Sequence, residues 1–147
     1  MNRKLIITLN LLKESYLKNL RFFDLQYSPT THFLSKFLLK EGFIEFFQVC
    51  QLSKFNNCSI IKIRLSYLSV TPVGNLVDYK GFKQTMPFKQ FIFMSKPNKK
   101  ITLSVKGIKK INVFNKVILM SSDVGFISGT EAIKRNIGGI YVGFFLI

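Results

Sequence analysis

The chain has 147 residues and a formal net charge of +15 at pH 7, because 22 lysines and arginines outnumber 7 acidic residues. A small chain this basic repels itself, so we expect a polyanionic partner, with nucleic acid the leading candidate and an anionic membrane surface the alternative. The 48% hydrophobic content excludes a disordered basic tail, and no stretch approaches the roughly 20 apolar residues that cross a bilayer.

The first half has the apolar spacing of helices followed by a β-hairpin. In chain order, the predicted elements are a helix over 5–18, a short strand over 20–27, a helix over 32–40 and two strands over 43–52 and 59–70. Thr30 or Thr31 is expected to cap the second helix, and Gly42 to end it in the left-handed conformation. The two strands are joined by a polar turn at 54–57 and form an antiparallel hairpin.

The second half is predicted to be rich in strands. Residues 71–75 break the preceding pattern and mark the expected lobe boundary, and residues 75–86 are interpreted as loop. The elements that follow are a strand over 89–94, a turn over 95–101, a buried strand over 117–120, a polar loop over 121–125, a short helix and a buried final strand over 140–147. Ser128 and Glu131 have capping-box spacing, so the helix begins after Ser128, and Asn136 helps to end it.

The segment from this polar loop to the last strand carries a recognisable pattern. Its residues fit a Ser-Thr-Ser-x-Gly loop, a hydroxyl residue three positions later, a helical alanine and a Gly-Gly pair. The matching residues, with no insertion between them, are Ser121, Ser122, Gly125, Ser128, Ala132, Gly138 and Gly139. This resembles the C-terminal signature of the family of the eighth protein of the small ribosomal subunit. The chain departs from the signature at Asp123, which replaces a serine, and at Ile140, which replaces an acidic residue.

Two further blocks are similar to the same family. Residues 38–45 look like its passage from helix to strand. Residues 95–97 are similar to its Ser-Arg-Pro-Gly turn, with Asn98 in the glycine position, where asparagine is the residue best able to keep a positive φ. The basic motif of the family's first helix is nearly gone here, and Lys13 is the one basic residue left there to meet a phosphate.

The resemblance implies an α+β fold of two small lobes: a helix–strand–helix–hairpin lobe at 1–72 and a β-rich RNA-binding lobe with one short helix at 73–147. It implies a structural constituent of the small ribosomal subunit that binds the central domain of the subunit's RNA and supports its folding and assembly in translation. Implied partners are this RNA and neighbouring small-subunit proteins, with no cofactor, metal, small-molecule substrate or membrane. The expected RNA-contact residues are Ser95, Lys96, Pro97, Lys99, Lys100, Ser121, Ser122, Gly125, Ser128 and Lys13.

Catalysis and metal binding find little support in the residues themselves. His32 is the single histidine and lies in a predicted helix, so we interpret it as a packed or surface residue and not as a general base. Cys50 and Cys58 cannot hold zinc alone and are interpreted as reduced structural thiols, although their spacing permits a disulfide. No glycine-rich phosphate-binding motif is present. The chain is therefore predicted not to be an enzyme.

Two residue types remain to be placed. The lysines from Lys96 to Lys116 have no acidic residue among them, and beside the loop at 121–125 they favour phosphate contact, because lysines release counterions from nucleic acid. Phenylalanines can stack on bases, but most of them fall at core-facing spacing, which favours core packing. The residues concerned are Phe22, Phe33, Phe37, Phe46, Phe91, Phe93, Phe144 and Phe145.

The source and two other functional classes stay open at this point. The composition, with 16 phenylalanines and no tryptophan, resembles that of an AT-rich genome. Together with the degraded first helix and no recognisable presequence, it predicts an organelle-encoded protein of the mitochondrial ribosome, with a plastid or a bacterial cytoplasm as alternatives. The other functions considered are a basic DNA- or RNA-binding protein outside the ribosome and a peripheral protein on anionic lipid.

Overall fold

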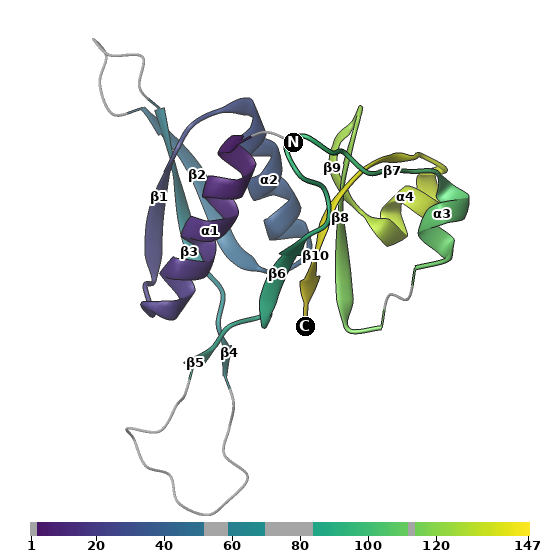
Figure 1. The fold of residues 1–147 in the computed structure, drawn as a ribbon. Coiled ribbons are helices and arrows are strands. Elements are labelled where there is room, and N and C mark those ends of the chain that lie inside the picture. The colour runs from purple at the N-terminus through teal and green to yellow at the C-terminus, as the bar shows by residue number, and fades with distance from the viewer. Residues whose placement is uncertain (1–2, 52–58, 70–83, 112–113) are drawn as a thin grey trace, which may run out of the picture.

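A computed structural model describes residues 3–51, 59–69, 84–111 and 114–147, and its class is the predicted α+β (Figure 1). The elements of the first half are α1 (Arg3–Leu17), β1 (Phe22–Gln26), α2 (Pro29–Lys40), β2 (Ile44–Gln51), β3 (Ser59–Leu65) and β4 (Leu68–Ser69). Those of the second half are β5 (Gln84–Thr85), β6 (Gln90–Phe93), β7 (Thr102–Leu103), α3 (Val105–Lys109), β8 (Lys116–Ser122), β9 (Gly125–Ser128), α4 (Gly129–Arg135) and β10 (Gly139–Leu146).

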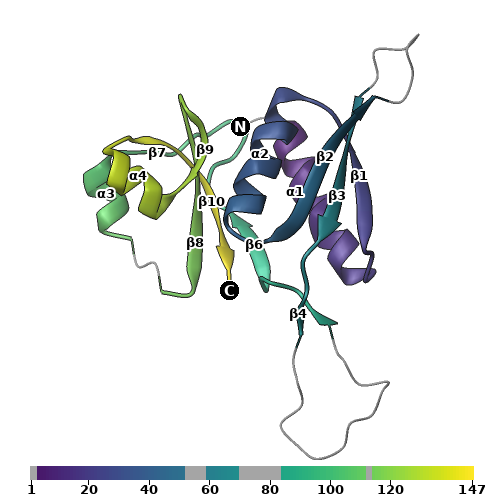
Figure 2. The same cartoon turned by 180° about the vertical axis from the view of Figure 1, so that it is seen from behind.

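The first half is a three-stranded antiparallel sheet in the order β1-β3-β2, with α1 and α2 packed on one of its faces (Figure 2). The predicted hairpin of β2 and β3 is confirmed. The core takes one residue per turn from α1 and every second residue from β3, as the two periodicities require. These buried residues are Leu5, Leu9, Leu12, Tyr16, Ile61, Ile63 and Leu65. The Tyr16 hydroxyl is also buried, and it donates a hydrogen bond to the Phe43 carbonyl.

The start of α2 differs from the prediction, because Ser28 caps it instead of Thr30 or Thr31. The Ser28 hydroxyl accepts from the Thr31 N–H at 3.1 Å, and the Thr31 hydroxyl accepts from the Ser28 N–H at 2.8 Å. This reciprocal pair is a capping box, with Pro29 at the first helical position, where its missing N–H has no consequence. The end of α2 is as predicted, with Gly42 at φ +80°.

The connection between the two halves is only partly described. The predicted strand over 59–70 ends at Leu65, and the two residues of β4 then pair with β5. Part of the segment interpreted as loop, residues 84–85, is therefore a short strand. The predicted turn at 54–57 and the predicted boundary at 71–75 lie outside the described residues.

The second half is an antiparallel sheet in the order β6-β10-β8-β9, with β7 also pairing with β10. Strand β10 is buried on both faces, as its continuous apolar sequence predicted. Tyr141 and Phe144 pack with Ile108 of α3 and Ala132 of α4, whereas Phe145 packs into the core beneath α1 and α2. A register shift after Tyr141 lets residues three apart face the same side. Helix α3 and strands β7 and β9 were not predicted.

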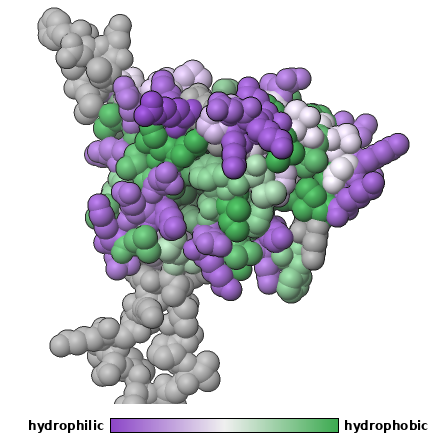
Figure 3. All heavy atoms as spheres, in the orientation of Figure 1, coloured by the Kyte–Doolittle hydropathy of each residue, from purple (hydrophilic) through white to green (hydrophobic). Residues whose placement is uncertain are grey.

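Most of the phenylalanines that were considered for base stacking pack in the core, as expected. Phe37, Phe144 and Phe145 are buried, and Phe91 and Phe93 pack against the core. The exceptions are Phe22, Phe33 and Phe46, which are 52%, 44% and 54% exposed. Figure 3 shows, on the face seen in Figure 1, that apolar surface is interspersed with hydrophilic side chains.

Candidate nucleic-acid interface

The predicted polar loop is the end of a tight β-hairpin. Ser121 and Ser122 belong to β8, and Ser122 pairs with Gly125 of β9. The connecting turn is therefore Asp123 and Val124 alone, and the sequence-based loop over 121–125 is too long. The Ser122 hydroxyl donates to the Gly125 carbonyl at 3.0 Å, which fixes its position at the hairpin end while it remains partly exposed.

Gly125 is required at its position for two reasons. Its φ of +107° is one that residues with a Cβ rarely adopt. A Cβ placed there would also lie 3.2 Å from Cδ1 of the Phe33 ring on α2. The hairpin end is thus packed against α2, and Phe33, which sequence analysis assigned to the core, instead forms half-exposed surface beside the signature residues.

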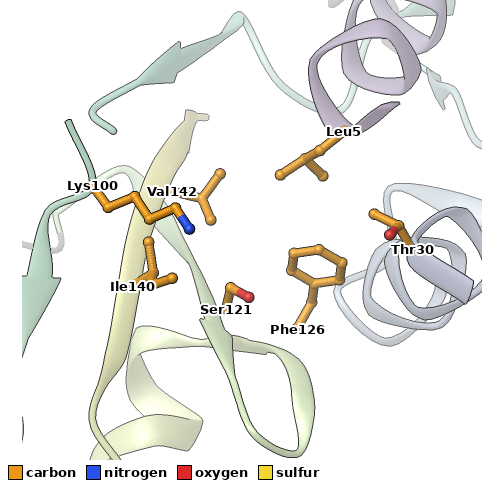
Figure 4. Close-up of a pocket in the computed structure, with 7 residues that line it drawn as sticks. All are labelled: Leu5, Thr30, Lys100, Ser121, Phe126, Ile140 and Val142. Atoms are coloured by element: carbon orange, nitrogen blue, oxygen red, sulfur yellow. The ribbon is translucent and has the colours of Figure 1, made fainter. Parts of the chain in front are cut away.

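A hollow of about 390 Å³ lies where the hairpin sheet meets the N-terminal ends of α1 and α2 (Figure 4). Lys100 and Ser121 both line it, so the structure brings together one member of the lysine run and one member of the signature. The other lining residues are Leu5, Thr30, Phe126, Ile140 and Val142. Ile140 pairs directly with Ser121 across the two strands, so this departure from the family signature makes the hollow more apolar beside the serine.

Ser95 is fully buried, unlike its neighbours in the predicted turn. Its hydroxyl donates to the Tyr141 carbonyl at 2.6 Å and accepts from the Ile101 N–H at 2.9 Å. Residues 96–100 are exposed, and the backbones of Lys96 and Lys99 exchange two hydrogen bonds across the turn. Asn98 does not adopt a positive φ. The prediction of that conformation is wrong, because a turn closed by these two bonds with Pro97 at its first corner can use negative φ values throughout.

Ser128 is also buried, and it caps α4 as predicted. Its hydroxyl accepts from the Glu131 N–H at 3.3 Å. The Glu131 carboxylate forms salt bridges with Lys40 of α2 at 2.7 Å and with Arg135 at 2.6 Å. The hydrogen bond from Lys40, aided by the charges of both cations, lowers the pKa of Glu131. These contacts tie α4 to α2 behind the hairpin.

The comparison with known proteins agrees with this arrangement. Residues 7–145 match the family model described as Ribosomal protein S8. The chain belongs to the ribosomal protein S8 family. It is also similar to small ribosomal subunit protein uS8 of Helicobacter acinonychis (strain Sheeba), with 24% identity over 132 residues that cover 90% of this chain and 88% of the relative. The predicted family is therefore confirmed, and with it a structural role in the ribosome.

Among the described residues in the second half of this S8-family protein, most lysines lie between β6 and β8, in the turn at 96–100 and in and after α3. The exposed lysines of the run are Lys96, Lys99, Lys100, Lys106, Lys109 and Lys110. Lys116 is partly buried, with its ammonium 4.8 Å from the centre of the Phe144 ring. Helix α3 carries Lys106 and Lys109 and begins at Ser104, whose hydroxyl accepts from the Gly107 N–H. That cap is the sequence signal that could have predicted α3.

Lys13 stands apart from the other expected contact residues. It is exposed on α1, eight residues beyond Leu5, which lines the hollow. At 1.5 Å per residue this is about 12 Å along the helix. The structure therefore does not group Lys13 with the hairpin of this S8-family protein.

The side chains considered for catalysis or metal binding have structural surroundings. The His32 ring lies 5.8 Å from both Tyr27 and Phe47, and burial, with a smaller effect from Lys36, lowers its pKa. Cys50 is a partly buried free thiol, and Cys58 lies outside the described residues. Within the described ranges, no three acidic, histidine or cysteine residues gather as metal ligands. No described helix has the length and apolarity to cross a membrane.

Proposed function

We propose that this S8-family protein binds the central domain of the small-subunit RNA through the end of its β8–β9 hairpin, and so supports folding and assembly of that RNA. The observation that carries the proposal is the fixed hairpin end, where Ser122 is bonded to Gly125 and Gly125 is packed against Phe33. A site held by such contacts loses little freedom on binding, so its hydrogen bonds contribute more fully to affinity.

The chemistry of this surface suits folded RNA. The Ser121 hydroxyl can both donate and accept, and the Ser122 hydroxyl, which donates to Gly125, can still accept. Such groups match the 2′-hydroxyls and base edges of a wide, shallow RNA minor groove. Lys100 lines the same hollow as Ser121, and Lys96, Pro97 and Lys99 are exposed in the turn just before it. These three lysines add positive charge. Phosphate contacts of this kind position the RNA, while contacts to its sugars and bases select it.

Two expected contact residues take a different role in this proposal. Ser95 and Ser128 are buried and have their hydroxyls engaged within the protein. We assign them the task of holding the lysine turn and α4 in place, and not direct contact with RNA. Lys13 is assigned a separate phosphate contact made by α1. Asp123, at the hairpin turn, repels phosphate and is assigned to accept from an RNA hydroxyl.

Other parts of the sequence-based interpretation also remain proposals. These are the division into lobes at residues 1–72 and 73–147, contacts with neighbouring small-subunit proteins, and the absence of enzymatic activity. The protein is assigned to the mitochondrial ribosome on its composition, and the similar bacterial protein keeps a bacterial source as the alternative. Sequencing of the DNA that flanks its gene decides between them: organellar genes on both sides support the assignment, and bacterial ones contradict it.

The test is Ser122→Val, which removes the hydroxyl and leaves a residue suited to a strand. Loss of one such hydrogen-bonding group is expected to weaken binding of a central-domain RNA fragment roughly tenfold, or about 1.4 kcal/mol. Ser59→Val is the matched control, since it removes a partly exposed strand hydroxyl from the other sheet. Equal affinities for the parent and Ser122→Val, measured by filter binding at fixed salt, would refute the assignment.

A further inference from the structure

A row of three side chains crosses the face of the N-terminal sheet that α1 and α2 leave open. Phe22 of β1, Arg64 of β3 and Phe46 of β2 are directly paired neighbours in the ladder, so their side chains point to the same face. Phe22 is 52% and Phe46 is 54% exposed. The row therefore presents two aromatic rings with a guanidinium group between them.

The sequence explains why these rings are on the outside. Phe22 is followed by Phe23, and Phe46 by Phe47. Successive side chains of a strand point to opposite faces, so only one member of each pair can pack in the core. Phe23 and Phe47 take the inner position and pack against the core.

A hollow of about 280 Å³ lies beside this row, at the end of the sheet where β1 begins and β3 ends. It is lined by Arg21, Glu45, Arg64, Leu65 and Tyr67. The guanidinium carbons of Arg21 and Arg64 lie 5.8 and 6.0 Å from the centre of the Phe22 ring. Arg64 Nε is 2.8 Å from Glu45 Oε2. Two arginines and one glutamate give the hollow a formal charge of +2 − 1 = +1. An anion that replaces Glu45 as the partner of Arg64 thus meets two guanidinium groups.

Two hydrogen bonds to backbone carbonyls fix this end of the sheet. The Leu65 N–H donates to the Arg21 carbonyl at 3.0 Å, which joins the start of β1 to the end of β3. The Tyr67 hydroxyl donates to the Leu20 carbonyl at 2.5 Å. The backbone that carries Arg21, Phe22 and Arg64 is therefore held by hydrogen bonds and is not a free loop.

We propose that this open face is a second RNA surface, which binds unpaired nucleotides. Their bases stack on Phe22 and Phe46, and their phosphates contact Arg21 and Arg64. Aromatic side chains on an open sheet are an effective platform for unpaired bases, and arginine suits phosphate because its planar group makes paired hydrogen bonds. The +15 charge of the chain favours this occupant over a protein partner. The face lies on the other sheet from the β8–β9 hairpin, so it goes beyond the function proposed above.

Fluorescence anisotropy of the full chain with a labelled uridine oligomer tests the proposal. Phe22→Leu and Phe46→Leu keep apolar side chains but remove the rings, and each is expected to weaken binding roughly five- to tenfold. Arg21→Gln should reduce the slope of log affinity against log salt by about 0.7, the value for one phosphate of a single strand. Glu45→Gln should raise the affinity, because it removes the competing acid.

Phe33→Leu is the matched control, since Phe33 is 44% exposed but lies beside the hairpin. It should leave oligomer binding unchanged. Ser122→Val should also bind the oligomer normally while losing affinity for the central-domain fragment, so failure of one proposal can be told apart from failure of the other. A photoreactive benzoylphenylalanine in place of Phe46 should crosslink to RNA in assembled subunits. Crosslinks to protein alone, or unchanged oligomer binding in the folded Phe22→Leu, Phe46→Leu double variant, would overturn the proposal.

Discussion

Replacing Ser95 with alanine tests whether this serine stabilises the fold or contacts RNA. The Ser95 hydroxyl is fully buried and links two strands, because it donates to the Tyr141 carbonyl on β10 and accepts from the Ile101 N–H beside β7. Ser95→Ala leaves both backbone groups without this partner. A buried polar group left unsatisfied costs about 1–3 kcal/mol. Since Ile101 is only partly buried, we expect a combined loss of about 2–3 kcal/mol.

For a chain of 147 residues, this loss corresponds to a fall in Tm of roughly 6–12 °C. Differential scanning calorimetry of the parent and Ser95→Ala measures it directly. At a temperature where the variant is still folded, its affinity for the central-domain RNA fragment should remain close to that of the parent, because the missing hydroxyl was enclosed. Ser122→Val is expected to lose affinity for the RNA fragment while its Tm stays close to that of the parent.

Ser35→Ala is the matched control. Ser35 is as deeply buried as Ser95, but its hydroxyl donates to the Thr31 carbonyl one turn earlier in the same helix. That carbonyl keeps its helical hydrogen bond, and alanine is the better helix former, so Ser35→Ala should change the stability little. If Ser95→Ala and Ser35→Ala lowered the Tm equally, loss of the cross-strand hydrogen bonds would not be the cause.

Three further substitutions test other contacts. Gly125→Ala should cost about 1–3 kcal/mol in urea unfolding, because of its φ of +107° and the Phe33 ring; an unchanged midpoint would contradict this. The pKa of Glu131 is lowered, so its contribution to stability is present above the ordinary value of 4.5 and lost as the pH falls through the folded value. Glu131→Gln should cost about 1 kcal/mol at pH 7 and flatten the acid limb of a stability–pH curve, and an unaltered limb would count against the ion pairs. Burial raises the pKa of Tyr16, so its contribution is present below the ordinary value of 10.0 and lost as the pH rises through the higher folded value. Tyr16→Phe should cost about 1–2 kcal/mol at pH 7 and flatten the alkaline limb; a curve parallel to that of the parent would exclude Tyr16 as its source.

The features that sequence analysis predicted well are set by local chemistry. Leucines at helical spacing predicted α1. The Ser128 cap predicted where α4 begins, and Asn136, which adopts the left-handed conformation, predicted where it ends. The continuous apolar sequence of β10 predicted burial on both faces. In each case the signal lies within a few consecutive residues, so the local pattern alone is informative.

The features that sequence analysis missed depend on contacts between residues that are distant in the sequence. Strand β9 has only four residues and starts with glycine, so pairing with β8 defines it and its own sequence does not. Ser95 and Ser122 have similar polar surroundings in sequence, yet β10 buries the first and leaves the second near the surface. The exposure of Phe22 could have been predicted, because a pair of adjacent phenylalanines in a strand must send one ring outward.

Strand β10 has a consequence for how the protein comes to be made. It supplies residues to both hydrophobic clusters and pairs with β6, β7 and β8. It follows every other described element in the chain, so it leaves a translating ribosome after all of them. Until then β6 and β8 lack the neighbour that lies between them, and both clusters are incomplete. A nascent chain stalled before Gly139 should therefore be readily cleaved by protease, whereas release of the last strand should confer resistance in a single step.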